Sequence, residues 1–228
     1  MASQDEQQEQ QPVYFWRETD PQTGWLSQWY YCPFRDDEDP SVVYDTAEQC
    51  VYSFPLLSAS PLPGPSTYMM YHKALLFGDR RVAAQVLAQG LHPRKVKALG
   101  RKVAGFDEAT WTARRGEIVR RGNVLKFTRA VTEEGFRKGT TAAGKTLRKT
   151  RAGTRLGDDD GLPPLIEGSL REMLLATGER EIVEASPYDS IWGIGFTERD
   201  AEGMREHWGE NLLGKALMEV RSELRESA

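Results

Sequence analysis

Positions 184–196 read Glu-Ala-Ser-Pro-Tyr-Asp-Ser-Ile-Trp-Gly-Ile-Gly-Phe. Two glycines around one isoleucine are unusual in a strand, because glycine weakens a strand unless a backbone or a ligand must come close. One interpretation is a tight turn that leads into a buried strand, with Asp189 as the turn cap and Trp192 in the core. The other is a pocket floor, in which a carboxylate beside an indole accommodates a flat ring. The segment alone leaves both open.

The neighbouring segments carry helix and strand signals. We expect strands at 181–185 and at 191–196, and a last helix that Asn211 caps. Ser169 and Glu172 form a capping-box pattern before a short helix. Asp107 has the position of the N-cap of a long helix.

Length and composition indicate one domain. A chain of 228 residues fits a single domain with insertions. We expect a disordered tail at 1–12 and a domain over 13–228. Proline-rich and small or charged residues indicate insertions at 50–67 and 131–168 within that domain.

Bulk properties limit the function classes. The net charge is −4 and the mean hydropathy is −0.58, so the chain as a whole is neither a polyelectrolyte binder nor a membrane protein. Two cysteines make no disulfide framework, and the three histidines show no metal-ligand spacing. We therefore expect no metal, no cofactor and no membrane contact, and an intracellular, cytoplasmic or nuclear location.

The segment 135–157 carries basic side chains and no acidic ones. Such a segment can contact nucleic acid through its charge. The alternative is a surface loop whose like charges repel one another.

A candidate catalytic pair emerges when 50–67 is treated as an insertion within one helix. Glu48 and Lys73 then lie two helical turns apart on one face, with Met70 between them and Phe77 continuing the apolar stripe. An acid and an amine on a partly apolar face can form a pocket pair. They can also be two unrelated solvated charges.

Several motifs, in the same order from about residue 15 to residue 224, resemble the YbiA/NADAR family of N-glycosidases. They are Ala-Glu-Gln (47–49), Tyr-Met-Met-Tyr-His-Lys-Ala-Leu-Leu-Phe-Gly-Asp (68–79), Gly-Arg-Lys-Val (100–103), Gly-Phe-Asp (105–107) with Trp111, Lys-Phe (126–127), Leu-Leu-Ala-Thr-Gly (174–178), the segment 184–196, and Trp-Gly-Glu-Asn-Leu-Leu-Gly (208–214).

The resemblance implies a predominantly α-helical α+β single domain with a few short strands. It also implies hydrolysis of a C–N bond between ribose and an amino-substituted base. Two substrate classes are implied: ribosylamino-pyrimidine phosphates of early riboflavin synthesis, and ADP-ribose attached to guanine. By motif position, Glu48, Trp111, Asp189 and Trp192 match residues that the family needs for activity, and Lys73 matches the lysine of the same helix.

These residues suggest a mechanism. Both substrates are glycosylamines that can open to an imine, so Lys73 could form a Schiff base with C1 and expel the base amine. Glu48 would move protons, and Asp189 would stabilise positive charge at C1 or hold a ribose hydroxyl. The alternative is direct hydrolysis, with a carboxylate that activates water.

The remaining candidates are substrate-binding residues. We expect Trp111 or Trp192 to stack the heterocycle, although each also suits the core. The full substrate-binding set is Trp111, Trp192, Phe77, Arg101, Arg115, Lys126 and Gly193. The three cations are candidates for phosphate binding, and a solvated helix face explains Arg115 equally well. The rival function is a non-catalytic module that binds ADP-ribose or a nucleotide.

Overall fold

The computed structural model describes residues 11–30, 32, 34–39, 42–44, 68–87, 93–129 and 169–227. Glu48 and the two predicted insertions lie outside the described residues, as does the predicted tail up to residue 10.

The described strands form two small sheets. The strands are β1 (Val13–Phe15), β2 (Phe34–Arg35), β3 (Val43–Tyr44) and β4 (Ile182–Glu184). β1 pairs with β4 in parallel, with Val13 opposite Ile182 and Phe15 opposite Glu184. β2 and β3 form an antiparallel pair. The strand predicted at 181–185 is confirmed.

Helices make up most of the rest. They are α2 (Tyr68–Leu76), α3 (Arg80–Val86), α4 (Pro93–Gly100), α5 (Glu108–Thr128), α8 (Leu170–Ala176), α9 (Glu198–Ala201) and α10 (Leu212–Glu226), with short 3-10 helices η1 (Gly24–Leu26) and η2 (Glu202–His207). The fold is a predominantly α-helical α+β single domain, as predicted.

Local capping explains where several helices begin. The Asp107 carboxylate accepts a hydrogen bond from the Thr110 N–H at 2.7 Å, so α5 begins where predicted. Ser169 and Glu172 form both hydrogen bonds of the predicted capping box at the start of α8.

Asn211 departs from its predicted role as a side-chain cap. It precedes α10 in the left-handed region, with φ of 50°, and its side chain forms no capping hydrogen bond. Its amide instead donates to the Ile182 carbonyl at 3.0 Å, and its Oδ1 accepts from the Glu184 N–H at 3.1 Å. Asn211 therefore joins β4 to the start of α10.

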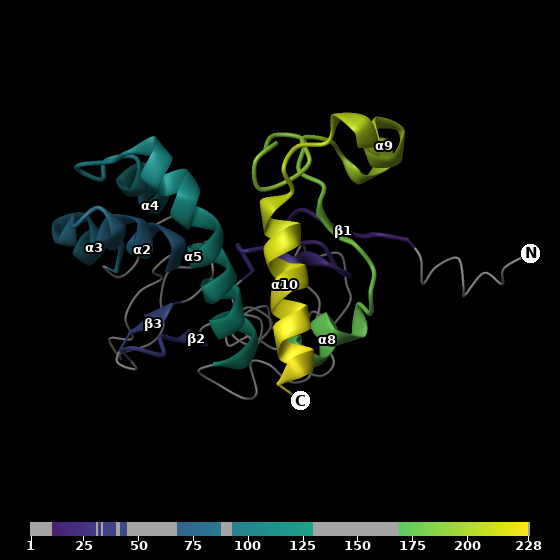
Figure 1. Cartoon of the computed structure of the whole chain (residues 1–228), viewed down its shortest axis with the longest axis horizontal. Coiled ribbons are helices and arrows are strands. Elements are labelled where there is room, and N and C mark those ends of the chain that lie inside the picture. The colour runs from purple at the N-terminus through teal and green to yellow at the C-terminus, as the bar shows by residue number, and fades with distance from the viewer. Residues whose placement is uncertain are drawn as a thin grey trace, which may run out of the picture.

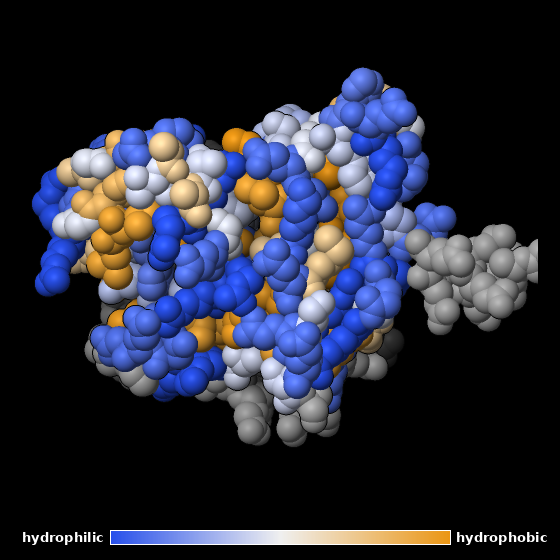
Figure 2. Space-filling model, in the orientation of Figure 1, coloured by the Kyte–Doolittle hydropathy of each residue, from blue (hydrophilic) through white to orange (hydrophobic). Residues whose placement is uncertain are grey.

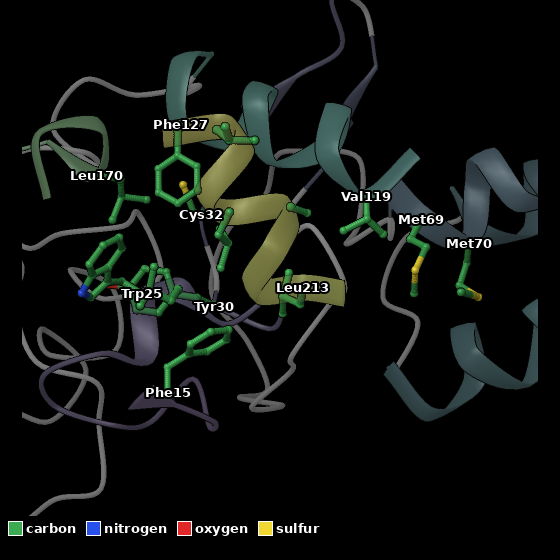
Figure 3. Packing of buried hydrophobic residues seen from close by; sticks show 14 of the residues in the cluster. Phe15, Trp25, Tyr30, Cys32, Met69, Met70, Val119, Phe127, Leu170 and Leu213 are labelled. Atoms are coloured by element: carbon green, nitrogen blue, oxygen red, sulfur yellow. The ribbon is translucent and has the colours of Figure 1, made fainter. Parts of the chain in front are cut away.

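The long helix α5 is central to the packing. It contacts α2, α8 and α10, and α10 also contacts β4 and α8. Figure 1 shows α5 and α10 crossing the middle of the molecule, with α2, α3 and α4 to one side and α9 near the other end. Side chains from the beginning, middle and end of the chain, including Phe15, Trp25, Phe127 and Leu213, share one hydrophobic core (Figure 3).

Candidate functional site

The Lys73 amine lies between two aromatic rings. Nζ is 4.1 Å from the centroid of the Phe106 ring and 5.1 Å from that of the Trp111 ring. Phe77, one turn further along the chain from Lys73, meets the Phe106 ring edge to face at 5.3 Å. The structure thus brings together three of the predicted residues, Lys73, Phe77 and Trp111, and adds Phe106.

Backbone geometry accounts for this arrangement. Gly78, with φ of 71°, adopts the left-handed conformation typical of a helix C-terminus directly after the last turn of α2. Gly105, with φ of 68°, adopts it before α5. Phe106 follows at the position before the Asp107 N-cap, from which it meets Lys73 of α2 and Phe77 directly after that helix.

The amine is half-buried, and burial lowers the pKa of Lys73 below its ordinary value of 10.5. The Glu108 carboxylate acts in the opposite direction and is the smaller influence on this pKa. A lysine with a lowered pKa has more of the neutral amine at neutral pH. It is therefore a better nucleophile than a solvated surface lysine.

The segment around Asp189 is a turn. The Asp189 Oδ1 accepts hydrogen bonds from the N–H groups of Ile191 and Trp192, at 2.9 and 2.8 Å, and its carbonyl accepts from Gly195 at 3.1 Å. The strand predicted at 191–196 is wrong, because these residues follow a bent path without strand pairing. Asp189 is thus a turn cap, and its carboxylate stays partly exposed.

Backbone hydrogen bonds hold this turn against the segment that leads into α10. The N–H groups of residues 209–213 donate to carbonyls of the turn in five pairs: Gly209 to Ile194, Glu210 to Ser190, Asn211 to Gly193, Leu212 to Ile191, and Leu213 to Trp192. These bonds position Trp192, which is half-buried against the main core.

Gly193 is explained by the protein's own backbone. A Cβ at this position would lie 2.5 Å from the Glu184 carbonyl oxygen and 3.0 Å from that of Asp189. Close packing of the turn on β4 therefore requires this glycine by itself, and its contact with a substrate stays a prediction.

One face of α5 connects the two halves of the candidate site. Trp111 and Arg115 are one turn apart, so they project from the same side of the helix. Trp111 contacts Lys73, whereas Arg115 forms an ion pair with Glu210 at 3.3 Å. The Glu210 N–H in turn donates to Ser190, next to Asp189. The ring pair around Lys73 and the Asp189 turn are thus attached to the same helix.

The candidate phosphate-binding cations differ in their surroundings. Arg101 is exposed, and Arg115 is buried in its ion pair. Lys126 is fully buried, and Nζ donates to the carbonyls of Trp25 and Ser27 at 2.7 and 2.9 Å. The structure therefore places Lys126 in the core, where it holds the η1 turn, and outside the phosphate-binding set.

Sequence reasoning missed Phe106, although a local signal exists. An apolar residue immediately before an N-cap commonly packs against the fourth helical residue, an arrangement called the hydrophobic staple. Phe106 and Trp111 occupy these two positions around Asp107. Phe106 remains 42% exposed, which leaves part of its ring accessible to a ligand.

Other features lie apart from these residues. A cavity of about 310 Å³ lies between the end of β1 and the start of α9, and its lining includes Trp16, Arg17 and Thr197. Within the described ranges, no group of three or more His, Cys, Asp or Glu side chains could hold a metal ion. None of the helices described is long and apolar enough to cross a membrane.

Comparison with known proteins identifies the relatives of this chain. The NADAR domain model matches residues 14–225. "N-glycosidase R617" of Acanthamoeba polyphaga mimivirus is 36% identical over 158 residues, which cover 68% of this chain and 71% of that protein. "Protein irg-1" of Caenorhabditis elegans is 32% identical over 69% of this chain and 58% of its own length.

A solved structure shares the fold. The NMR structure of the E. coli protein YbiA aligns with a TM-score of 0.54 and 18% identity, covering 95% of this chain and 86% of that one. At this identity the similarity concerns the fold alone.

Proposed function

We propose, since the chain belongs to the NADAR domain family, that it is an N-glycosidase that hydrolyses the C–N bond between a ribose and the exocyclic amine of a base. Hydrolysis of N-glycosyl bonds fits the mimivirus relative, which is named an N-glycosidase. The observation that carries the proposal is the half-buried Lys73 amine between two rings, with its pKa lowered by burial.

The proposed reaction begins with the open-chain imine of the substrate. The neutral Lys73 amine adds to C1, and the base amine leaves with a proton, so that an iminium forms between Nζ and C1. Water then adds to C1, the Lys73 amine leaves, and the free sugar closes its ring. The net change is consumption of one water, with release of the sugar and the amino base.

The other residues have supporting roles in this scheme. Glu48 supplies the proton to the leaving nitrogen and takes one from water. Asp189 directs its partly exposed carboxylate to positive charge at C1 or to a ribose hydroxyl, while its Oδ1 keeps the turn in place. Trp111 and Trp192 border the flat base, and Phe77 supports the Phe106 ring.

Two substrate classes remain in the proposal: ribosylamino-pyrimidine phosphates and ADP-ribosylated guanine. Arg101 is the exposed candidate for a substrate phosphate. The basic segment 135–157 adds a contact with nucleic acid if the guanine is part of a strand. Deleting 135–157 should then lower activity on the DNA-linked substrate and spare small substrates. Equal loss on both would contradict that contact.

The decisive experiment is borohydride trapping during turnover. A substrate-derived adduct should form on the wild-type protein and be absent in Lys73→Ala, with Lys97→Ala as a control for an exposed lysine on α4. Active enzyme without any adduct would favour direct hydrolysis. Turnover assays of the wild type and of Glu48→Gln with both substrate classes separate an enzyme from a binding module. An enzyme turns over substrate in the wild type and loses this activity in Glu48→Gln, whereas a module binds its ligand without turnover in both proteins.

A further inference from the structure

The two hydrophobic-staple positions at the start of α5 both hold aromatic residues. Phe106 and Trp111 occupy the two positions that normally pack against each other, and both of their rings contact the Lys73 ammonium. Among the large hydrophobic side chains described, Phe106 is one of five that remain clearly exposed, whereas Trp111 is 8% exposed. Figure 2 shows that hydrophilic residues dominate the visible face of the molecule, with hydrophobic ones gathered in patches.

A ring face carries partial negative charge and attracts a cation within about 6 Å of its centroid. Nζ lies within that limit of both rings. Glu108, in the first turn of α5, adds a carboxylate to the charges that act on this amine. Burial disfavours positive charge at Nζ, and the two rings and Glu108 favour it.

We propose that Phe106 is a positioning residue that, together with Trp111, forms an aromatic cage holding positive charge at Nζ of Lys73. The cage acts first on the ammonium of the free protein. The second half of the inference rests on the proposed function. After C1 of the substrate has become attached to Nζ, the cage stabilises the iminium, because this nitrogen still shares the positive charge. Trp111 forms the buried wall and Phe106 the exposed wall of this cage.

The cage has a chemical consequence. A neutral amine gains little from the ring faces, whereas the ammonium before the reaction and the iminium during it both gain. The rings therefore stabilise the ammonium that precedes the attack of Nζ on C1 and the iminium that follows it. They also hold Nζ in the same position during the attack. Phe77 fixes the Phe106 ring edge to face at 5.3 Å.

The first test measures Lys73 in the free protein. Acetic anhydride labels only neutral amines, so competitive labelling across pH, read by peptide mass spectrometry, gives the pKa of Lys73. Phe106→Leu keeps an apolar staple but removes the ring face, and it should lower this pKa by about half a unit. Phe106→Trp should keep or raise it. Leu75→Ala, which alters a similarly exposed apolar residue on α2, should leave it unchanged.

A variant of unchanged size guards against altered packing. Trifluorinated phenylalanine at position 106 keeps the ring but weakens its negative face, so it should act in the same direction as Phe106→Leu. If the leucine, fluorinated and tryptophan variants all match the wild type, Phe106 is only a staple and the cage is wrong.

The second test concerns the iminium. With substrate and borohydride, Phe106→Leu should yield about threefold less trapped adduct, the factor that corresponds to half a pKa unit, and Phe106→Trp should restore it. Equal trapping in both variants overturns the iminium half of the inference. If active wild-type protein yields no adduct, both the Schiff-base mechanism and the effect of the cage on the iminium are overturned. The effect of the cage on the ammonium of the free protein is then still decided by the labelling experiment alone.

Discussion

At the scale of single residues, Asp189 combines a structural and a proposed chemical role. Asp189→Asn keeps an oxygen that can accept from the Ile191 and Trp192 N–H groups, but it removes the negative charge. We expect a free energy of unfolding within about 1 kcal/mol of the wild type and activity reduced about 100-fold. Urea unfolding and turnover assays measure the two effects separately.

Asp189→Ala is the matched variant. It loses the turn hydrogen bonds as well as the charge, so it should lower the free energy of unfolding by about 1 kcal/mol more than Asp189→Asn does. Full activity in Asp189→Asn would show that the carboxylate is a turn cap and nothing else.

Lys126 is a second residue whose surroundings give a sharp expectation. Burial lowers its pKa to about 8, against an ordinary value of 10.5. Lys126→Met leaves the Trp25 and Ser27 carbonyls without this donor and should destabilise the protein by about 2 kcal/mol at pH 7.

The destabilisation should also depend on pH. Between about pH 8 and pH 10.5 the unfolded wild-type chain binds a proton at Lys126 that the folded chain has lost, so folding of the wild type gains stability as pH rises. The gap between wild type and Lys126→Met should therefore widen above pH 8, as measured by urea unfolding at pH 7, 8.5 and 9.5. A constant gap would show that the folded-state pKa is not lowered.

At the scale of elements, close backbone approach decides how two helical glycines respond to substitution. A Cβ on Gly214 in α10 would collide with the Ile182 carbonyl oxygen of β4 and lie 2.5 Å from the Asn211 Oδ1. A Cβ on Gly116 in α5 would meet nothing within 4 Å. The same substitution should therefore have opposite effects.

We expect Gly214→Ala to lower the free energy of unfolding by about 3 kcal/mol, because β4 and α10 must separate. Gly116→Ala should raise it by about 0.5–1 kcal/mol through helix propensity. Denaturant midpoints of the two variants test this. Equal tolerance of both substitutions would contradict the contact between β4 and α10.

The elements also show what the sequence could predict. Asp107 and the Ser169–Glu172 box were predictable because a cap is determined by neighbours three residues away. The Asp189 turn cap was one of two interpretations of the sequence, but the strand expected at 191–196 was wrong, since its backbone partners at 209–213 are distant in sequence and replace the pairing that a strand would need. The burial of Lys126 likewise depends on carbonyls about a hundred residues away.

The residues of the candidate site also include some that the sequence could predict and others that it could not. Lys73, Phe77 and Trp111 were predictable from helical spacing and motif resemblance, and the structure brings them together. Phe106 was missed because its staple position predicts only packing at the start of α5, whereas the exposure of its ring and its contact with Lys73 have no signature in a single sequence. The sequence could not show that backbone of β4 approaches Gly193, and the predicted substrate contact of this glycine stays a prediction.

At the scale of the whole molecule, a buried polar cluster attaches the β2–β3 sheet to α2. The Tyr44 hydroxyl donates to the Asp36 carboxylate at 2.8 Å and lies 3.4 Å from the His72 Nε2. Burial, opposed by Asp36, lowers the pKa of His72 below 6.5. Asp37, Glu38 and Arg121 are the further charges that act on this histidine.

The sign of the pH effect follows from this direction. As pH falls below 6.5, the unfolded chain takes up a proton at His72 before the folded chain does, so stability is lost until the folded-state pKa is passed. We expect urea midpoints to fall between pH 7.5 and pH 5, and to fall less in His72→Gln. An equal fall in both proteins would assign the acid sensitivity to other groups.

The parallel pairing of β1 with β4 has a consequence for the time course of synthesis. Val13 pairs with Ile182, and the segment that orders the Asp189 turn extends to Leu213. Contacts between such distant positions slow folding, because a long stretch of chain must close before they form. At roughly 5–20 residues per second, a ribosome releases β1 many seconds before its partner exists. In the nascent protein, the pairing of β1 with β4 and the ordered Asp189 turn therefore form only after residue 213 has left the ribosome.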